Sequence, residues 1–198
     1  MATVNSYTVI MPTPDKTSLD AIVQAARALL EEDGLGGLTM QAVARRVGVR
    51  APSLYKRVQS RDELIQLVAE ASLTDLADRL NASSSPLQLA NRFRAFGHEH
   101  PAAFQLIMTP GAGTPVARPE FGLAASEAVL QLAGTLAGTD DALEAARTFT
   151  AWAAGFVSME LNGGFNLGGN IEQAWEFGVT RIVAAITATR SDVEIGAP

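Results

Sequence analysis

Apolar residues recur at intervals of three and four along most of the chain, the spacing that places them on one face of an α-helix. The segment 19–30 shows the pattern clearly, with apolar residues at Leu19, Ile22, Val23, Ala26, Leu29 and Leu30. No stretch alternates between apolar and polar residues for long enough to indicate a β-sheet. The pattern therefore predicts an all-α fold.

Residues with known preferences for helix ends divide this pattern into segments. Ser18 can cap a first helix that begins near Leu19, and Gly34, Gly36 and Gly37 can end it. Residues 1–16 show no pattern that would tie them to a core, so we expect a flexible arm there. Beyond two short helices, we expect helices at 61–80, 87–98, 101–108, 121–138, 140–162 and 171–190, which gives about nine helices in all.

The two short helices are joined by a tight turn. Thr39 can cap the first of them, over 40–47, and Gly48 can adopt the left-handed conformation that ends it. The second, over 51–58, carries Pro52 in its first turn, where proline is tolerated. A long helix followed by two short ones with a glycine turn between them predicts a helix-turn-helix, whose last helix enters the major groove of DNA.

The composition excludes several classes of protein. Apolar residues make up 47% of the 198 residues, and there is no cysteine, so disulfide and thiolate chemistry are excluded. No apolar run reaches the roughly 18 residues that a membrane span needs. The first residues lack the basic start of a signal peptide. We therefore expect a cytoplasmic protein with no membrane partner.

Charge is distributed unevenly along the chain. The formal net charge is −6, but residues 1–61 carry +3 and residues 62–198 carry −9. Such a split indicates that the N-terminal part binds a polyanion while the acidic remainder of the chain repels it. The alternative interpretation is an ordinary solvated surface. Residues 34–61 contain six basic residues and no acidic one, namely Arg45, Arg46, Arg50, Lys56, Arg57 and Arg61.

Residues 38–65, LTMQAVARRVGVRAPSLYKRVQSRDELI, resemble the DNA-binding signature of the TetR family of transcriptional regulators. The matching features include Ala-Val-Ala in the second helix, Gly-Val at the turn and Leu-Tyr in the recognition helix. The C-terminal half is similar to the TetR class named for a Trp-His-Gly pattern, with Trp152 and Gly155 present and the histidine missing. The resemblance implies a DNA-binding domain at 17–65 and a ligand-binding and dimerisation domain at 66–198.

The resemblance also assigns residues to the contact with DNA. Thr39 and Tyr55 are expected to contact phosphates, with Arg50 and Lys56 beside them. Pro52, Ser53 and Tyr55 would face the groove. For Tyr55 the alternative is a half-buried core position. The exposed side of the third helix carries hydrogen-bond donors that suit phosphates and base edges. The full set of expected DNA-binding residues is Thr39, Gln41, Arg50, Ala51, Pro52, Ser53, Tyr55, Lys56, Arg57 and Arg61.

A pocket and a dimer interface are implied for the C-terminal half. The helix over 140–162 is apolar on more than one side, so we expect it to pack against other helices on two of its sides. In the family, the last two helices pair with those of a second copy. Pocket residues are expected at Phe93, Phe104, Ile107, Met108, Phe121, Trp152, Phe156 and Met159, with simple core packing as the alternative. Interface residues are expected at Phe149, Ala153, Trp175, Val179, Ile182 and Ile186.

The function that the sequence favours is a transcriptional repressor that binds a palindromic operator on double-stranded DNA as a homodimer. A small apolar or amphipathic effector would release it. The alternatives are an enzyme and a helical interaction protein without DNA binding. His98 and His100 stand two residues apart, so on a helix they point in different directions and do not suit a metal. We expect no catalytic residues, no metal and no cofactor.

Overall fold

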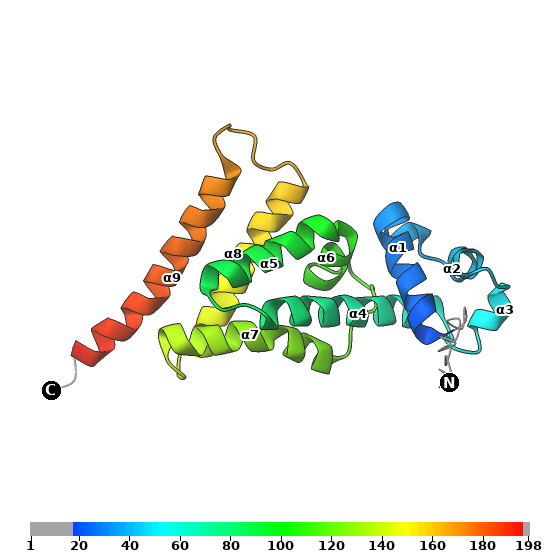
Figure 1. Cartoon of the computed structure of the whole chain (residues 1–198), viewed down its shortest axis with the longest axis horizontal. Helices are drawn as coiled ribbons and strands as arrows, with labels where there is room; N and C mark the ends of the chain where they lie inside the picture. Colours follow the sequence, from blue (N-terminus) through cyan, green and yellow to red (C-terminus); the bar gives the residue numbers. More distant parts are fainter. Residues whose placement is uncertain (1–17, 196–198) are drawn as a thin grey trace, which may run out of the picture.

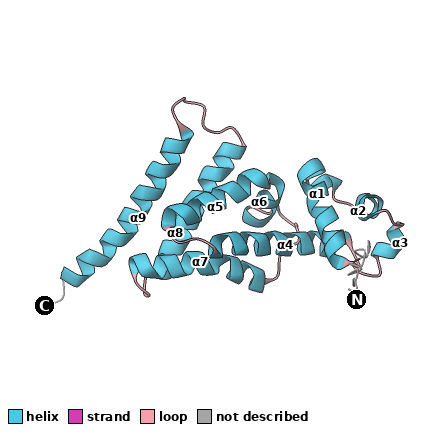
Figure 2. Cartoon of the chain, viewed as in Figure 1, coloured by secondary structure: helices cyan, strands magenta, loops and turns pink. Residues whose placement is uncertain are grey.

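The chain folds into helices throughout the part that the structure describes. The computed structural model gives the backbone of residues 18–195 and the side chains of residues 18–188, so the arm expected at 1–16 lies outside the described residues. Every regular element in this range is an α-helix (Figures 1 and 2), which confirms the predicted fold class. The helices are α1 (Leu19–Gly37), α2 (Met40–Val47), α3 (Ala51–Leu54), α4 (Arg61–Asn81), α5 (Pro86–Glu99), α6 (Pro101–Met108), α7 (Pro119–Ala137), α8 (Ala142–Leu161) and α9 (Ile171–Ile195).

Serine or threonine hydroxyl groups cap the N-termini of four of these helices. Each accepts a hydrogen bond from the backbone N–H three residues further on, which satisfies one of the amides that a helix start leaves without a partner. Before α4 the bond is reciprocal, because the Glu63 carboxylate also accepts the backbone N–H of Gln59 at 2.6 Å. The four capping residues are Ser18, Thr39, Ser60 and Ser85, of which Ser18 and Thr39 were predicted.

Helix boundaries agree with the sequence-based ones within two residues for α4 to α8. Of the glycines expected to end the first helix, Gly34 forms a kink with φ 67° and Gly37 is the last residue of α1. At the other end of the chain α9 runs five residues beyond its predicted end at 190. Neither glycine nor proline interrupts the sequence 179–195, so nothing in that stretch ends the helix.

Helix α4 is the element that joins the two halves of the molecule. At one end it packs with α1, and α2 and α3 are attached to this small bundle. Along the rest of its length α4 packs against α5, α6 and α7, and α7 in turn packs against α8. Figure 1 shows α3 and α9 at opposite ends of the long axis. The buried side chains form one continuous hydrophobic cluster from Ile22 to Val179.

Candidate nucleic-acid interface and ligand cavity

A left-handed glycine sets the angle between α2 and α3. Gly48 has φ 75° and ψ 34°, a conformation that costs other residues energy because of their Cβ atom. Its N–H bonds back to the carbonyl of Arg45, and the N–H of Val49 bonds to the carbonyl of Ala44 at 3.0 Å. These bonds close the end of α2 and direct the chain into α3, as the predicted turn requires.

Helix α3 is shorter than predicted. The sequence indicated a helix over 51–58, whereas the structure ends the regular helix at Leu54 and continues as a turn. The backbone N–H groups of Arg57 and Val58 both bond to the carbonyl of Leu54, at 2.8 and 2.9 Å. Leu54 and Val58 are fully buried, and Ser60 is already extended to cap α4, so the chain has to leave the helix between them.

The predicted DNA contacts lie on the exposed side of this α2–α3 segment. Arg50, Pro52, Lys56 and Arg57 are exposed, and Tyr55 has 52% of its surface accessible. At the start of α2, Thr39 and Gln41 are exposed too, with the Thr39 hydroxyl accepting the N–H of Ala42. Ala51 and Ser53 are half-buried. Donors and an aromatic hydroxyl are thus gathered on one convex element that is free of acidic side chains.

Two of the basic residues are engaged elsewhere in the fold. Arg61 donates from Nε to the carbonyl of Leu38 at 2.7 Å and from a terminal nitrogen to the carbonyl of Leu35. The Arg61 guanidinium therefore ties the α1–α2 connection to the start of α4, a structural role that the prediction of a DNA contact did not include. Arg46 forms a two-bond ion pair with Glu32 of α1, and this pairing lowers the pKa of the Glu32 carboxyl.

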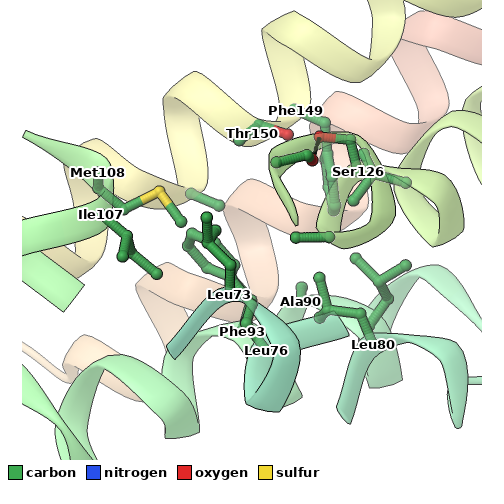
Figure 3. A pocket seen from close by; sticks show the side chains of 15 residues that line it. Leu73, Leu76, Leu80, Ala90, Phe93, Ile107, Met108, Ser126, Phe149 and Thr150 are labelled. Carbon is green, nitrogen blue, oxygen red and sulfur yellow. Dashed lines mark hydrogen bonds between the residues drawn. The ribbon is translucent and has the colours of Figure 1, made fainter. Parts of the chain in front are cut away.

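An apolar cavity of about 230 Å³, partly open to solvent, lies between α4, α5, α6, α7 and α8 (Figure 3). We call it the apolar cavity. None of the described residues that line it carries a charge. Its hydroxyl groups belong to Ser126 of α7 and Thr150 of α8. The lining is Leu73, Leu76, Leu80, Leu89, Ala90, Phe93, Ile107, Met108, Gly122, Ala125, Ser126, Val129, Phe149, Thr150 and Ala153.

Three of the eight residues expected in a pocket line this cavity, namely Phe93, Ile107 and Met108. Phe104 instead lines, with Met108, a wider and more polar groove of about 550 Å³ between α6 and α8. Phe121 lies against the Arg118 guanidinium, and Met159 is 47% exposed. The remaining two belong to an aromatic cluster in the core.

That aromatic cluster joins α8 to α9 and has its centre at Trp175, which is fully buried. The Trp152 and Trp175 rings stack with centroids 4.9 Å apart, and Phe156 meets Trp175 edge-on at 5.1 Å. The Trp175 indole N–H donates to Asn91 Oδ1 at 2.7 Å. A Cβ at Gly178 would lie only 2.1 Å from the Trp152 ring, so the stacking requires a glycine there.

Four of the six residues expected at a dimer interface are covered by their own chain. Phe149, Ala153, Trp175 and Val179 are each no more than 5% exposed, so they leave almost no surface for a partner. Phe149 and Ala153 line the apolar cavity instead. Ile182 and Ile186 are half-buried. The sequence-based prediction put Phe149 and Ala153 of α8 at an interface with a partner, whereas in the structure both side chains are buried inside their own chain.

Ion pairs that the sequence did not predict connect α4 to its neighbours. Glu70 is 4% exposed and accepts hydrogen bonds from Nε and a terminal nitrogen of Arg118, at 2.8 and 3.1 Å. The Arg118 guanidinium lowers the pKa of the Glu70 carboxyl. The partners stand 48 positions apart in the sequence, in α4 and just before α7. The pair ties the residue before α7 to Glu70 of α4, three residues before Leu73, which lines the apolar cavity.

The part of the chain that the structure describes contains neither a metal-binding cluster nor a membrane-crossing segment. No three of its His, Asp or Glu side chains come together in a group that could hold a metal ion. None of the helices between residues 18 and 195 is long and apolar enough to span a bilayer.

Comparison with known protein families gives two adjoining matches. Residues 22–68 match the family described as "Bacterial regulatory proteins, tetR family". Residues 87–182 match "Tetracyclin repressor-like, C-terminal domain". The first match contains the predicted helix-turn-helix, and the second contains most of the lining of the apolar cavity.

Individual proteins agree with these families. The chain is 31% identical over 170 residues to the class A tetracycline repressor of transposon 1721 from Escherichia coli, which covers 80% of this chain and 76% of that protein. It is 28% identical over 159 residues to an HTH-type transcriptional regulator of Mycobacterium tuberculosis, covering 76% and 73%. Among solved structures, a TetR variant from Acinetobacter baumannii AYE in complex with minocycline has a TM-score of 0.64 at 23% identity, covering 87% and 98%.

Proposed function

Because the chain belongs to the TetR family and is a DNA-binding transcriptional regulator, not an enzyme, we propose that it represses transcription as a homodimer on a palindromic operator. An apolar small molecule in the apolar cavity releases it from the DNA. The observation that carries the proposal is the α2–α3 segment, whose exposed donors lie at one end of an otherwise acidic chain. Because the rest of the chain is acidic, a polyanion such as DNA is attracted to this basic end and repelled elsewhere.

On the operator, the α3 segment would occupy the major groove and the start of α2 would lie along the backbone. Arg50, Lys56 and Tyr55 are exposed and reach phosphates in this arrangement, with the Thr39 hydroxyl at the beginning of α2. Pro52 and Ser53, in the first turn of α3, are nearest the base edges. Arg61 has a smaller share in this contact, because its guanidinium is bonded to the carbonyls of the α1–α2 connection.

The dimer is proposed to form through the outward faces of α8 and α9, at the end of the molecule away from α3 (Figure 1). Phe177 is 62% exposed on α9, and Ile182 and Ile186 follow it on the same helix. A twofold axis through this end would leave both α3 segments free to face one DNA duplex. Residues 17–65 and 66–198 then act as a DNA-binding and a regulatory domain, with α4 crossing between them.

Selection of binding sites from random DNA tests the proposed function. The full chain should enrich sequences with two inverted half-sites, whose centres lie about one helical turn or a multiple of it apart. The selected site should then be bound about 10³-fold more tightly than a scrambled site of the same length. Fluorescence anisotropy at a fixed salt concentration measures both affinities. Enrichment of single, non-repeated sites would contradict the homodimer, and equal affinity for both DNAs would contradict the function.

The lining of the apolar cavity restricts the effector to neutral molecules. A charged group inside it would lose its hydration without gaining a counter-charge, a cost of several kcal/mol. The Ser126 and Thr150 hydroxyls can each offer a hydrogen bond to a polar group of an otherwise apolar ligand. The minocycline-bound TetR of similar fold shows that a small molecule is held by a relative.

Three probes with the same alkyl chain test this restriction: 1-decanol, decanoate and decylammonium. Decanol should raise the melting temperature, because a ligand at a hundred times its Kd stabilises by about 2.7 kcal/mol. The two charged probes should not. Ser126→Trp, which fills the exposed edge of the cavity, should weaken the response to decanol. Leu123→Trp, in an exposed position of the same helix outside the cavity, is the matched control. Equal stabilisation by all three probes would contradict a neutral effector.

A further inference from the structure

The start of α6 is capped by a side chain from a distant helix. Glu31 lies in α1, and its carboxylate oxygens accept the backbone N–H groups of Ala102 and Ala103, both at 2.9 Å. These amides belong to the first turn of α6, where N–H groups have no partner within the helix. A negative charge is favoured there by the helix dipole as well. Glu31 thus forms two charge-assisted hydrogen bonds across 71 and 72 positions of sequence.

Helix α6 has no capping side chain directly before it, a feature that it shares with α3, α7 and α8. The helices α1, α2, α4 and α5 are each capped by a serine or threonine directly before them. His100 holds that position before α6, and in the described part of the chain it makes no side-chain capping bond. The first turn of α6 is therefore held by the neighbouring α1, and through α1 by the bundle that carries α2 and α3.

The other end of α6 forms part of the cavity wall. Ile107 and Met108, the last two residues of the helix, line the apolar cavity. Helix α6 has eight residues and is about 12 Å long, and its backbone hydrogen bonds connect the two ends. A ligand that displaces Ile107 and Met108 therefore also displaces Ala102 and Ala103 relative to the Glu31 carboxylate.

We propose that Glu31 is a positioning residue that couples the apolar cavity to the DNA-binding helices. This inference rests on the proposed function. With the cap formed, α6 holds α1 in the orientation that suits the operator. A ligand in the cavity shifts α6, and the two hydrogen bonds either break or pull α1 with them. Because coupling between two sites is reciprocal, operator binding must also stabilise the cap.

A second ionic contact keeps α1 docked when Glu31 is changed. Arg27, one turn before Glu31, donates to Asp75 of α4 at 2.8 Å, and Asp75 also accepts from Arg79. Burial by itself would raise the pKa of Asp75, but the hydrogen bonds from these two arginines outweigh it and leave the pKa lowered. Buried α1 residues such as Leu30 remain in the core as well. Variants at Glu31 are therefore expected to fold.

Hydrogen–deuterium exchange of the α6 segment 101–108, with and without the selected operator, tests the proposal in the full chain. In the unmodified protein, saturating operator should slow α6 exchange by about fivefold or more, the low end of typical coupling. Glu31→Ala should reduce this effect to less than about twofold while still binding the operator. Asp33→Asn is the matched control, since Asp33 is an exposed acid two residues further along α1, and it should keep the full effect.

Glu31→Gln gives an independent measurement. The amide side chain keeps one accepting oxygen but turns a donor toward the second backbone N–H, so operator should slow α6 exchange by an intermediate factor. The proposal is overturned if Glu31→Ala retains the full operator-dependent slowing, or, should that variant not fold, if Glu31→Gln does. It is overturned too if operator binds the unmodified protein without slowing α6 exchange. Failure of any DNA to bind specifically, seen by anisotropy, refutes the proposed function itself.

Discussion

Phe177→Asp is expected to convert the proposed homodimer into monomers and to remove tight operator binding with it. Phe177 is 62% exposed on α9 and is covered within its own chain mainly by the Arg181 guanidinium, 5.2 Å from the ring centre. In a symmetric interface the substitution would replace two apolar rings by two carboxylates, and their desolvation costs several kcal/mol even with Arg181 nearby. Dimer affinity should fall by about 100-fold or more.

Light scattering at micromolar concentration measures this change, and the melting temperature shows whether the protomer remains folded. Leu123→Asp introduces the same charge at an exposed position of α7 and should leave the dimer intact. Ile182→Asp is a less clean test, because Ile182 is half-buried within the protomer and its replacement would also lower the stability of the fold. A Phe177→Asp protein that stays dimeric would place the interface elsewhere.

Lys56→Ala and Tyr55→Ala are expected to weaken operator binding and to reduce its dependence on salt. Removing one ionic bond to a phosphate makes the slope of log K against log salt shallower by about 0.9. The charged residue should therefore show the larger change in slope. Both side chains are exposed, so neither variant should change the melting temperature much. Titration of a labelled operator at four or five salt concentrations gives the slope.

Lys56→Arg is the control for charge, since it keeps the cation and should retain the slope. Ser53→Ala should instead relax the sequence preference, at about 1–3 kcal/mol for the loss of a bond to a base, with an unchanged slope. If the alanine variants at Tyr55 and Lys56 bind the operator with unchanged affinity and slope, the α3 segment is not the recognition element.

The helical fold could be predicted because its signals are local. Thr39 and Gly48 determine the ends of α2 by bonds to residues within a few positions, so the sequence alone was sufficient to place that helix. The end of α3 was placed too late because it depends on the capping of the next helix by Ser60 and on the burial of Val58. Those two constraints come from tertiary packing, which periodicity does not report.

The cavity and the proposed interface were harder to separate by sequence. Helix α8 is apolar on two sides, and nothing in its pattern says which side faces the protomer core. The stacking of Trp152 on Trp175 decides the orientation, and it depends on Gly178 in another helix. Phe149 and Ala153 consequently point into the cavity, and Trp152 is used for packing. Contacts such as Glu70 with Arg118 are likewise invisible in the sequence, because either charge alone is typical of a surface.

The cross-links from α1 also limit how this regulator could be re-engineered as a biosensor. A chimaera that exchanged the whole of residues 17–65 for another DNA-reading module would lose Arg27 and Glu31, and with them the bonds to Asp75 and to the first turn of α6. The C-terminal half would then have lost its bonds to α1, and α4 would remain its covalent connection to the new module. A graft confined to residues 39–58 keeps α1 with its native partners and replaces only the proposed DNA-reading surface. The exchangeable unit of this protein is therefore smaller than its DNA-binding domain.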